Sequence, residues 1–244
     1  MLLRAILITQ KAGTSQTIDV ASAGTLEELI GTDKDKIEEL TLTGKLNTFD
    51  FDFIKTMSNL KLLDISSLTN TTLPASCLAN STITTVLLPL SLTAIPNRAF
   101  YQAAITSIYI PETVESIGAR AFYGCESLTL MEIPQGVTEL QSAAFRNCKS
   151  LELVTLPQSL QAISDRVFRE CSALSQIRIP KNVDRIGTEA FHSCKNLSTV
   201  VVENPSELGD NAFAYCDELQ YFCIGEVETI GSGIFTASKK VSVY

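Results

Sequence analysis

Cysteine is the residue type whose spacing most suggests chemistry in this chain. Five cysteines are separated by 23, 23, 23 and 22 residues, namely Cys125, Cys148, Cys171, Cys194 and Cys216. Zinc sites usually take their thiolates in close pairs such as C-x₂-C, and this sequence contains no such pair. Thiols stacked in register could reach disulfide distance, since Cα separations of about 5–6 Å suit that bond. We predict buried free thiols instead, because side chains in such a column run parallel into the core.

The other residue types used in catalysis do not form a constellation. His192 is the only histidine, and the motifs G-x-S-x-G, G-x-G-x-x-G and H-E-x-x-H do not occur in the sequence. His192 follows Phe191 at a position that we expect to face solvent, and the carboxylates are scattered. We therefore predict that the chain is not an enzyme and has no catalytic residue, no cofactor and no metal site.

Phenylalanine and proline follow the same period as cysteine. Phenylalanines recur at intervals of 22 or 23 residues, at Phe100, Phe122, Phe145, Phe168, Phe191, Phe213 and Phe235. Prolines recur at the same intervals, at Pro89, Pro111, Pro134, Pro157 and Pro180. Three residue types that share one period indicate a tandem repeat, and a period of this length predicts a stacked solenoid.

Each repeat reads L-x-x-I-x-I-P-x-x-V-x-x-I-G-x-x-A-F-x-x-C. The alternation in L-x-x-I-x-I predicts a short strand that ends at the proline, which cannot donate to a sheet ladder. V-x-x-I predicts a second extended piece, and A-F-x-x-C a helical or 3₁₀ turn that buries Phe and Cys. Since neighbouring repeats should stack about 4.8 Å apart, each position becomes a ladder along the solenoid.

The chain divides into an N-terminal cap and a repeat region. We predict a cap over residues 1–36, with a strand at TIDV and a short helix at TLEELI whose Thr25 and Glu28 fit a capping box. The opening MLLRAILITQK is interpreted as the start of a folded domain, because Arg4 interrupts its apolar run. Residues 37–244 should form about nine repeat units, the last incomplete. The apolar surface at the C-terminal end of the solenoid should be covered by further chain, by a partner or by end-to-end self-association.

The repeats resemble those of a known family. L-x-x-L-x-L is typical of leucine-rich repeats, and ITSIYIPETVESIGARAFYGCES is similar to repeats of the BspA-like family of bacterial, Bacteroides-type cell-surface proteins. The resemblance covers residues 18–244. It implies a right-handed, β-dominated α/β leucine-rich-repeat solenoid with short helical or 3₁₀ turns. It also implies a secreted or surface-tethered module whose relatives are linked to adhesion to host matrix or to cells, and it supplies no catalytic residue.

Outward-facing strand residues are the candidate binding site. Two columns should form a concave sheet face, and several of their members are apolar or aromatic where a merely solvated face would be polar. The candidate ligand-binding residues are Leu87, Tyr109, Leu130, Glu132, Leu153, Thr155, Gln176, Arg178, Val201 and Tyr221. The alternative is that the β-propensity of these residues, not binding, explains their presence.

Charge and hydropathy exclude some partners and leave others open. The net charge of −8, without a long Lys/Arg stretch, argues against nucleic acid, and no run of 18 apolar residues predicts a membrane span. We predict a protein or glycan ligand, with host extracellular matrix as one source, and an export signal removed from the mature chain. The open alternatives are a stalk that displays another domain and an intracellular interaction scaffold.

Overall fold

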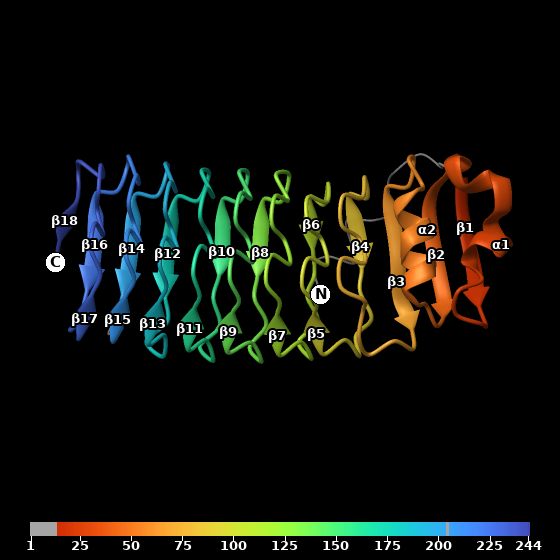
Figure 1. Cartoon of the computed structure of the whole chain (residues 1–244), viewed down its shortest axis with the longest axis horizontal. Helices are drawn as coiled ribbons and strands as arrows, with labels where there is room; N and C mark the ends of the chain where they lie inside the picture. The colour runs from red at the N-terminus through yellow and green to blue at the C-terminus, as the bar shows by residue number, and fades with distance from the viewer. Residues whose placement is uncertain (1–13, 204) are drawn as a thin grey trace.

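The computed structural model describes residues 14–203 and 205–244, which form one rod of stacked chain turns (Figure 1). The turns follow one another along the rod in sequence order, from the N-terminal to the C-terminal end. The prediction made for the opening residues 1–11 lies outside the described part of the chain. The stacked solenoid predicted from the 22–23 residue period is confirmed, as is the β-dominated character that the resemblance implies.

The main sheet takes one strand from each turn, and every strand pair in it is parallel. Parallel pairing follows because the chain completes a full turn before it returns to the sheet. The hydrogen-bonded ladder has three stretches, formed by the first five strands of this sheet, the next two and the last four. The strands are β1 (Thr14–Val20), β2 (Ile37–Gly44), β3 (Leu62–Leu68), β4 (Thr85–Leu87), β6 (Ser107–Ile108), β8 (Leu130–Glu132), β10 (Leu153–Thr155), β12 (Gln176–Ile179), β14 (Thr199–Val202), β16 (Tyr221–Ile224) and β18 (Ser242–Val243).

A second parallel sheet runs from Ala94 to Ile230 and is built from the V-x-x-I segments. Its inward residues, such as Ile117, Leu140 and Ile163, are fully buried. Its ladder is unbroken, because every strand between the first and the last pairs with the strands of the turns before and after it. The strands are β5 (Ala94–Ile95), β7 (Ser116–Ile117), β9 (Glu139–Leu140), β11 (Ala162–Ile163), β13 (Arg185–Ile186), β15 (Glu207–Leu208) and β17 (Thr229–Ile230).

The A-F-x-x-C segment closes each repeat as a run of tight turns rather than a helix. Tyr123 N donates to Arg120 O (3.2 Å) as in a 3₁₀ turn, whereas Phe122 N donates to Ala144 O of the next repeat (2.8 Å). Arg120 has φ +56° and Gly124 has φ +70°. Residues in this left-handed region end each helical turn before it can propagate, so the segment gains a ladder of bonds between repeats instead.

The phenylalanine column is the centre of the core. From Phe100 to Phe213 every ring is fully buried. Successive rings stack with centroid separations of 5.0–5.5 Å, close to the spacing of the strands. Phe235 differs, because it is only partly buried and its ring is tilted 6.5 Å from Phe213.

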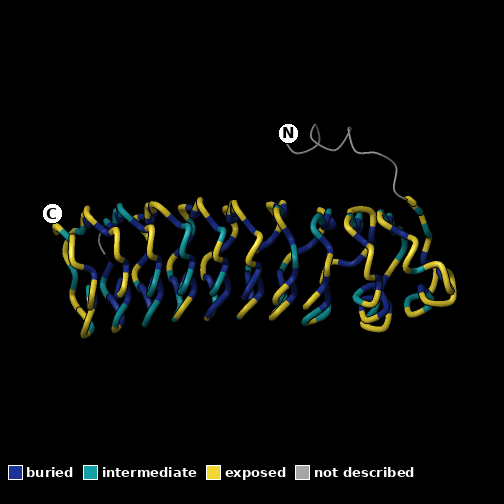
Figure 2. The backbone as a smooth tube through the Cα atoms, turned by 90° about the horizontal axis from the view of Figure 1, so that it is seen from above, coloured by how far each residue is buried: buried dark blue, intermediate teal, exposed yellow. Residues whose placement is uncertain are grey.

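The rod is almost straight in two perpendicular views (Figure 2). The main sheet face is therefore close to flat, whereas the sequence predicted a concave face. A leucine-rich repeat curves when bulky helices spread its outer side. Here the sheets and the turn segments all carry backbone hydrogen bonds between adjacent repeats, for example Gly118 N to Ile95 O (2.9 Å) and Gly124 N to Arg146 O (2.8 Å). Since these sides share one repeat spacing, little curvature accumulates.

The N-terminal region contains the helices α1 (Leu26–Ile30), η2 (Gly31–Lys36, 3₁₀) and α2 (Thr48–Lys55). The predicted strand and first helix are present, but the predicted Thr25/Glu28 capping box is wrong, because the Thr25 hydroxyl donates to Ser22 O (2.7 Å). The backbone N–H of Leu26 instead donates to buried Asp50 (3.0 Å). Since β1 pairs with β2, the main sheet extends into the region predicted as a cap; the boundary at residue 36 stays a prediction.

Helix α2, which the repeat pattern did not predict, has a capping box of its own. Asn47 Oδ1 accepts from Phe49 N (2.9 Å), and Asp50 Oδ2 accepts from Asn47 N (2.8 Å). Asp50 also accepts from Gly24 N (2.7 Å), so one buried carboxylate joins the starts of both α-helices. This shared cap fixes the N-terminal turns against the first repeats.

Candidate functional site

The main sheet face is positioned by the alternation of each strand. The central residue of each strand, such as Val86, Met131 and Val154, lies in the core, so its two neighbours must point outward. Parallel pairing in register places the outward residues in two columns, with Leu130 opposite Leu153 and Glu132 opposite Thr155. The core sequence therefore determines which residues the face presents.

The structure places all ten predicted site residues on this outward face. Tyr109, Leu130, Leu153 and Tyr221 expose 43%, 39%, 42% and 52% of their surface, which is high for large apolar side chains. Leu87 and Val201 are half-buried. The polar members are exposed, namely Glu132, Thr155, Gln176 and Arg178. The columns thus form one surface, and their role in binding stays a prediction.

A shallow hollow of about 510 Å³ lies on this face. It is located over β10, β12 and β14, where the hydrogen-bonded ladder of the main sheet is interrupted between β10 and β12. Five of the predicted residues line it, namely Leu153, Thr155, Gln176, Arg178 and Val201. Arg178 is largely exposed and pairs with Glu203 (2.9 Å), which leaves a cation beside a mixed apolar and polar floor.

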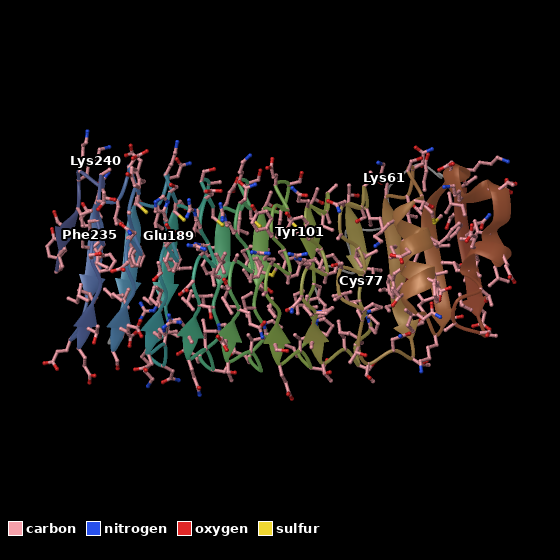
Figure 3. The ribbon with its side chains drawn as sticks, in the orientation of Figure 1. Lys61, Cys77, Tyr101, Glu189, Phe235 and Lys240 are labelled. Carbon is pink, nitrogen blue, oxygen red and sulfur yellow. The ribbon has the colours of Figure 1, made fainter. Side chains whose placement is uncertain are left out.

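The edge formed by the tight turns, on which Figure 3 labels Tyr101 and Glu189, carries a network that the sequence pattern did not predict. Tyr101 and Tyr123 stack with their rings 4.9 Å apart, and the guanidinium groups of Arg98 and Arg146 lie 5.8 and 5.6 Å from those rings. Both tyrosines follow a core phenylalanine, so the signal was present in the period. Because the ring faces already contact each other and arginine, this stack stabilises the edge rather than presenting free aromatic surface.

The same edge continues as ion pairs further along the rod. Arg146 pairs with Glu170 (3.3 Å), Arg169 pairs with both Glu170 (3.1 Å) and Glu189, and Arg166 pairs with Glu189 (2.7 Å). Partial burial acts to raise the pKa of Glu189, but Arg166 and Arg169 outweigh it and hold this pKa below its ordinary value. The charges are therefore largely paired within the chain.

His192 is half-buried on this edge, which corrects the prediction that it faces solvent. Its ring lies 5.0 Å from that of Tyr215, and its Nδ1 is 2.8 Å from Ser193 Oγ. Burial, followed by the positive charge of Arg169, lowers its pKa. Tyr215 covers this position from the next repeat, a contact that position in the repeat alone does not indicate.

The cysteine column is a ladder of hydrogen bonds, and the predicted buried free thiols are confirmed. Each thiol donates to the carbonyl of the phenylalanine one repeat earlier, as from Cys125 to Phe100 O (3.0 Å) and from Cys171 to Phe145 O (3.2 Å). Ser238 occupies the same column and donates to Phe213 O (3.0 Å). The column therefore requires a small donor that satisfies a buried carbonyl, and thiol chemistry is not needed.

We expect Cys171→Ser to reduce the loss of stability in alkali. Burial raises the pKa of Cys171 from its ordinary 9.0 to about 12, so the unfolded chain loses this proton first. The contribution of the Cys171 thiol to the free energy of unfolding is complete below pH 9 and falls by about 1.4 kcal/mol per pH unit up to pH 12. Serine keeps the donor but does not ionise in this range.

The measurement is the free energy of urea unfolding as a function of pH for wild type and Cys171→Ser. Cys223→Ser serves as the control, because Cys223 is exposed. An equal alkaline slope in wild type and Cys171→Ser would contradict the proposed role of the buried thiol.

Neither a cluster of potential metal ligands nor a long apolar helix occurs in the part of the chain that the structure describes. Residues 14–203 and 205–244 contain no cluster of three or more His, Cys, Asp or Glu side chains placed to hold a metal ion. Within the same ranges, no helix has the length and apolar character needed to cross a membrane. The best-defined surface feature of the described residues is the main sheet face with its hollow.

Comparison with known proteins gives the family. The model of the BspA type leucine-rich repeat region matches residues 32–104 and 115–242, in six copies. A leucine-rich repeat protein of Treponema pallidum is 31% identical, with 68% of this chain and 78% of that one covered and a TM-score of 0.57. One from Bacteroides ovatus is 20% identical, with 92% and 68% covered and a TM-score of 0.60. No match was found among curated proteins. With the repeat matched over most of its length, the chain belongs to the BspA-type leucine-rich repeat family.

Proposed function

We propose that the chain is a non-enzymatic binding module, secreted or displayed at a bacterial cell surface, that recognises a protein or glycan ligand through its main sheet face. The observation that carries this proposal is the exposure of Tyr109, Leu130, Leu153 and Tyr221 on one sheet face. Exposed apolar groups rimmed by polar ones are typical of interaction surfaces. The leucine-rich-repeat scaffold suits this use, because its ladders keep the surface fixed while outward residues vary.

The arrangement of the face supports recognition of an extended ligand. Its apolar part runs from Leu87 on β4 to Leu153 on β10, and the hollow with Arg178 lies directly beside it. A ligand that lies along the rod would contact the apolar part and place a polar or acidic group near Arg178. Aromatic side chains such as Tyr109 stack well on sugar rings and on peptide side chains, so both ligand classes fit.

We expect the double variant Tyr109→Glu with Leu153→Glu to lose ligand binding while keeping its fold. Both side chains point outward, so the substitutions place charge in the contact area and leave the core unchanged. The measurement is a binding screen of purified protein against host extracellular-matrix proteins and mucin glycans, with at least a roughly tenfold loss of affinity expected. Circular dichroism and thermal unfolding verify that the variant is folded.

The matched control is Ser116→Glu with Ala162→Glu on the second sheet, where both side chains are half-buried and outward. This control should bind as wild type does. Equal binding by the face variant and wild type would contradict the proposal and place the site elsewhere.

The straightness of the rod favours a second candidate, a stalk that holds another domain away from its point of attachment. Hydrogen bonds on several sides of each repeat resist bending, which suits a spacer. Under this alternative, wild type binds none of the ligands tested. A fused reporter domain would then be displaced by the full length of the rod.

A further inference from the structure

The main sheet face carries opposite charges placed symmetrically about one strand. Glu132 on β8, Thr155 on β10 and Arg178 on β12 occupy the same outward column, each 23 residues from the next. Glu132 and Arg178 therefore lie one strand to either side of Thr155, about 5 Å from it along the rod. In Figure 1, β8, β10 and β12 follow one another in this order.

We propose that the face recognises a second copy of this chain, in a face-to-face pair. The twofold axis of this pair lies midway between the two faces and runs parallel to strand β10. This proposal rests on the proposed use of the main sheet face and names its partner. A twofold axis along β10 reverses the order of the strands, so β8 of each copy lies over β12 of the other. Glu132 then meets Arg178 of the second copy, and symmetry produces this ion pair twice.

The other outward residues are compatible with the same axis. Leu153 lies on β10 and meets its own counterpart. Tyr109, directly after β6, lies over Val201 of the second copy on β14, so apolar groups face one another at matching distances from the axis. Leu130 of the second copy comes over Gln176, which lines the hollow. An apolar side chain thus lies above the recess beside Leu153 rather than against a charge.

The shape of the rod allows this contact over several strands. Because the face is nearly flat, two copies can lie against each other from β4 to β16, a length of about 30 Å. Stacked sheets pack about 10 Å apart, a gap that a Glu and an Arg side chain can span together. Arg178 already pairs with Glu203, yet its five N–H donors can serve two carboxylates. The contact is narrow, and we expect a weak, reversible dimer.

Charge reversal provides the test, with sedimentation equilibrium of the purified chain over a wide concentration range as the measurement. Wild type should show a mass that rises toward the dimer. Glu132→Arg opposes two arginines across the axis, and Arg178→Glu opposes two glutamates, so each variant alone should dimerise at least about tenfold more weakly. Mixed in equal amounts, the two variants should dimerise with each other, because every charge again meets its opposite.

Controls change the same charges away from the face. Glu139→Arg lies on β9 of the second sheet, Arg120→Glu lies on the turn edge, and both native side chains are exposed. These variants should dimerise as wild type does. The double variant Glu132→Arg with Arg178→Glu should also dimerise, which separates a charge pair from a loss of folding.

Three results would overturn the proposal. They are a monomeric wild type at all concentrations, dimers that both single variants leave unchanged, and failure of the mixed variants to pair. Unchanged dimers would point to another surface, such as the C-terminal end of the rod. If wild type is monomeric and binds a ligand that the Tyr109→Glu, Leu153→Glu variant does not bind, only self-recognition is excluded. Retained ligand binding in that variant would instead contradict the proposed function.

Discussion

Phe168→Ala is expected to destabilise the chain by about 3–5 kcal/mol, measured as the free energy of urea unfolding. The Phe168 ring is fully buried and stacks between Phe145 (5.5 Å) and Phe191 (5.2 Å). Alanine removes both stacking contacts and leaves a cavity that the repeats above and below cannot close, because their own ladders fix their positions.

Two comparisons separate stacking from simple burial. Phe168→Leu should cost clearly less than alanine, since Leu78 occupies the same column and is fully buried there. Phe235→Ala should also cost less, because Phe235 is only partly buried and its ring is tilted against Phe213 rather than stacked on it. Equal losses at Phe168 and Phe235 would contradict a column stabilised by neighbours on both sides.

The shape of the unfolding transition carries further information. In a repeat protein each unit contacts only its neighbours, so stability is close to a sum of unit and interface contributions. A cavity at Phe168 weakens two adjacent interfaces near the middle of the rod. We expect the transition to broaden as well as shift, because the two halves of the rod become less strongly coupled.

The core of this fold could be predicted from the sequence because each turn repeats the same solution. The shared period of Phe, Cys and Pro determined the stacking, and alternation about residues such as Val154 determined which side chains face outward. All ten candidate residues accordingly lie on the main sheet face. Their function does not follow from the period, because the outward positions are those that stacking leaves free to vary.

Features that depend on one contact rather than on the period could not be predicted. Asp50 closes a local capping box with Asn47, but its bond to Leu26 N spans 24 residues of chain, and no local motif indicates that contact or the burial of the carboxylate. The thiol ladder depends on where the carbonyl of the preceding Phe points, which the letter Cys does not show. The flatness of the face depends on the relative thickness of the sides of the rod. That property is collective and appears only when all repeats are stacked.

Gly209→Ala is the second substitution with a large expected effect. A Cβ at Gly209 would lie 2.4 Å from Thr188 N and 2.5 Å from Gly187 C, both backbone atoms of the preceding repeat. The neighbouring repeat cannot move away without lengthening its hydrogen bonds to this one. We expect a loss of at least about 1–3 kcal/mol in the free energy of unfolding.

The hydrogen bonds at this position show why glycine matters there. Where the residue is glycine, its N–H bonds to the preceding repeat at 2.7–2.9 Å, as at Gly118, Gly187 and Gly209. Where it is Ser164 or Gln141, the same bond measures 3.0 and 3.4 Å. Glycine thus permits the closest approach of two repeats, and a side chain holds them apart.

The control for this substitution is Gly136→Ala, because a Cβ there meets no atom closer than Val114 O at 3.1 Å. It should cost clearly less than Gly209→Ala. In the opposite direction, Ser164→Gly removes a side chain from the equivalent position and should leave the fold intact. If Gly209→Ala were no more destabilising than Gly136→Ala, the repeats would have to be free to separate at this step. The unbroken ladder of the second sheet, in which β15 pairs on both sides, argues that they are not.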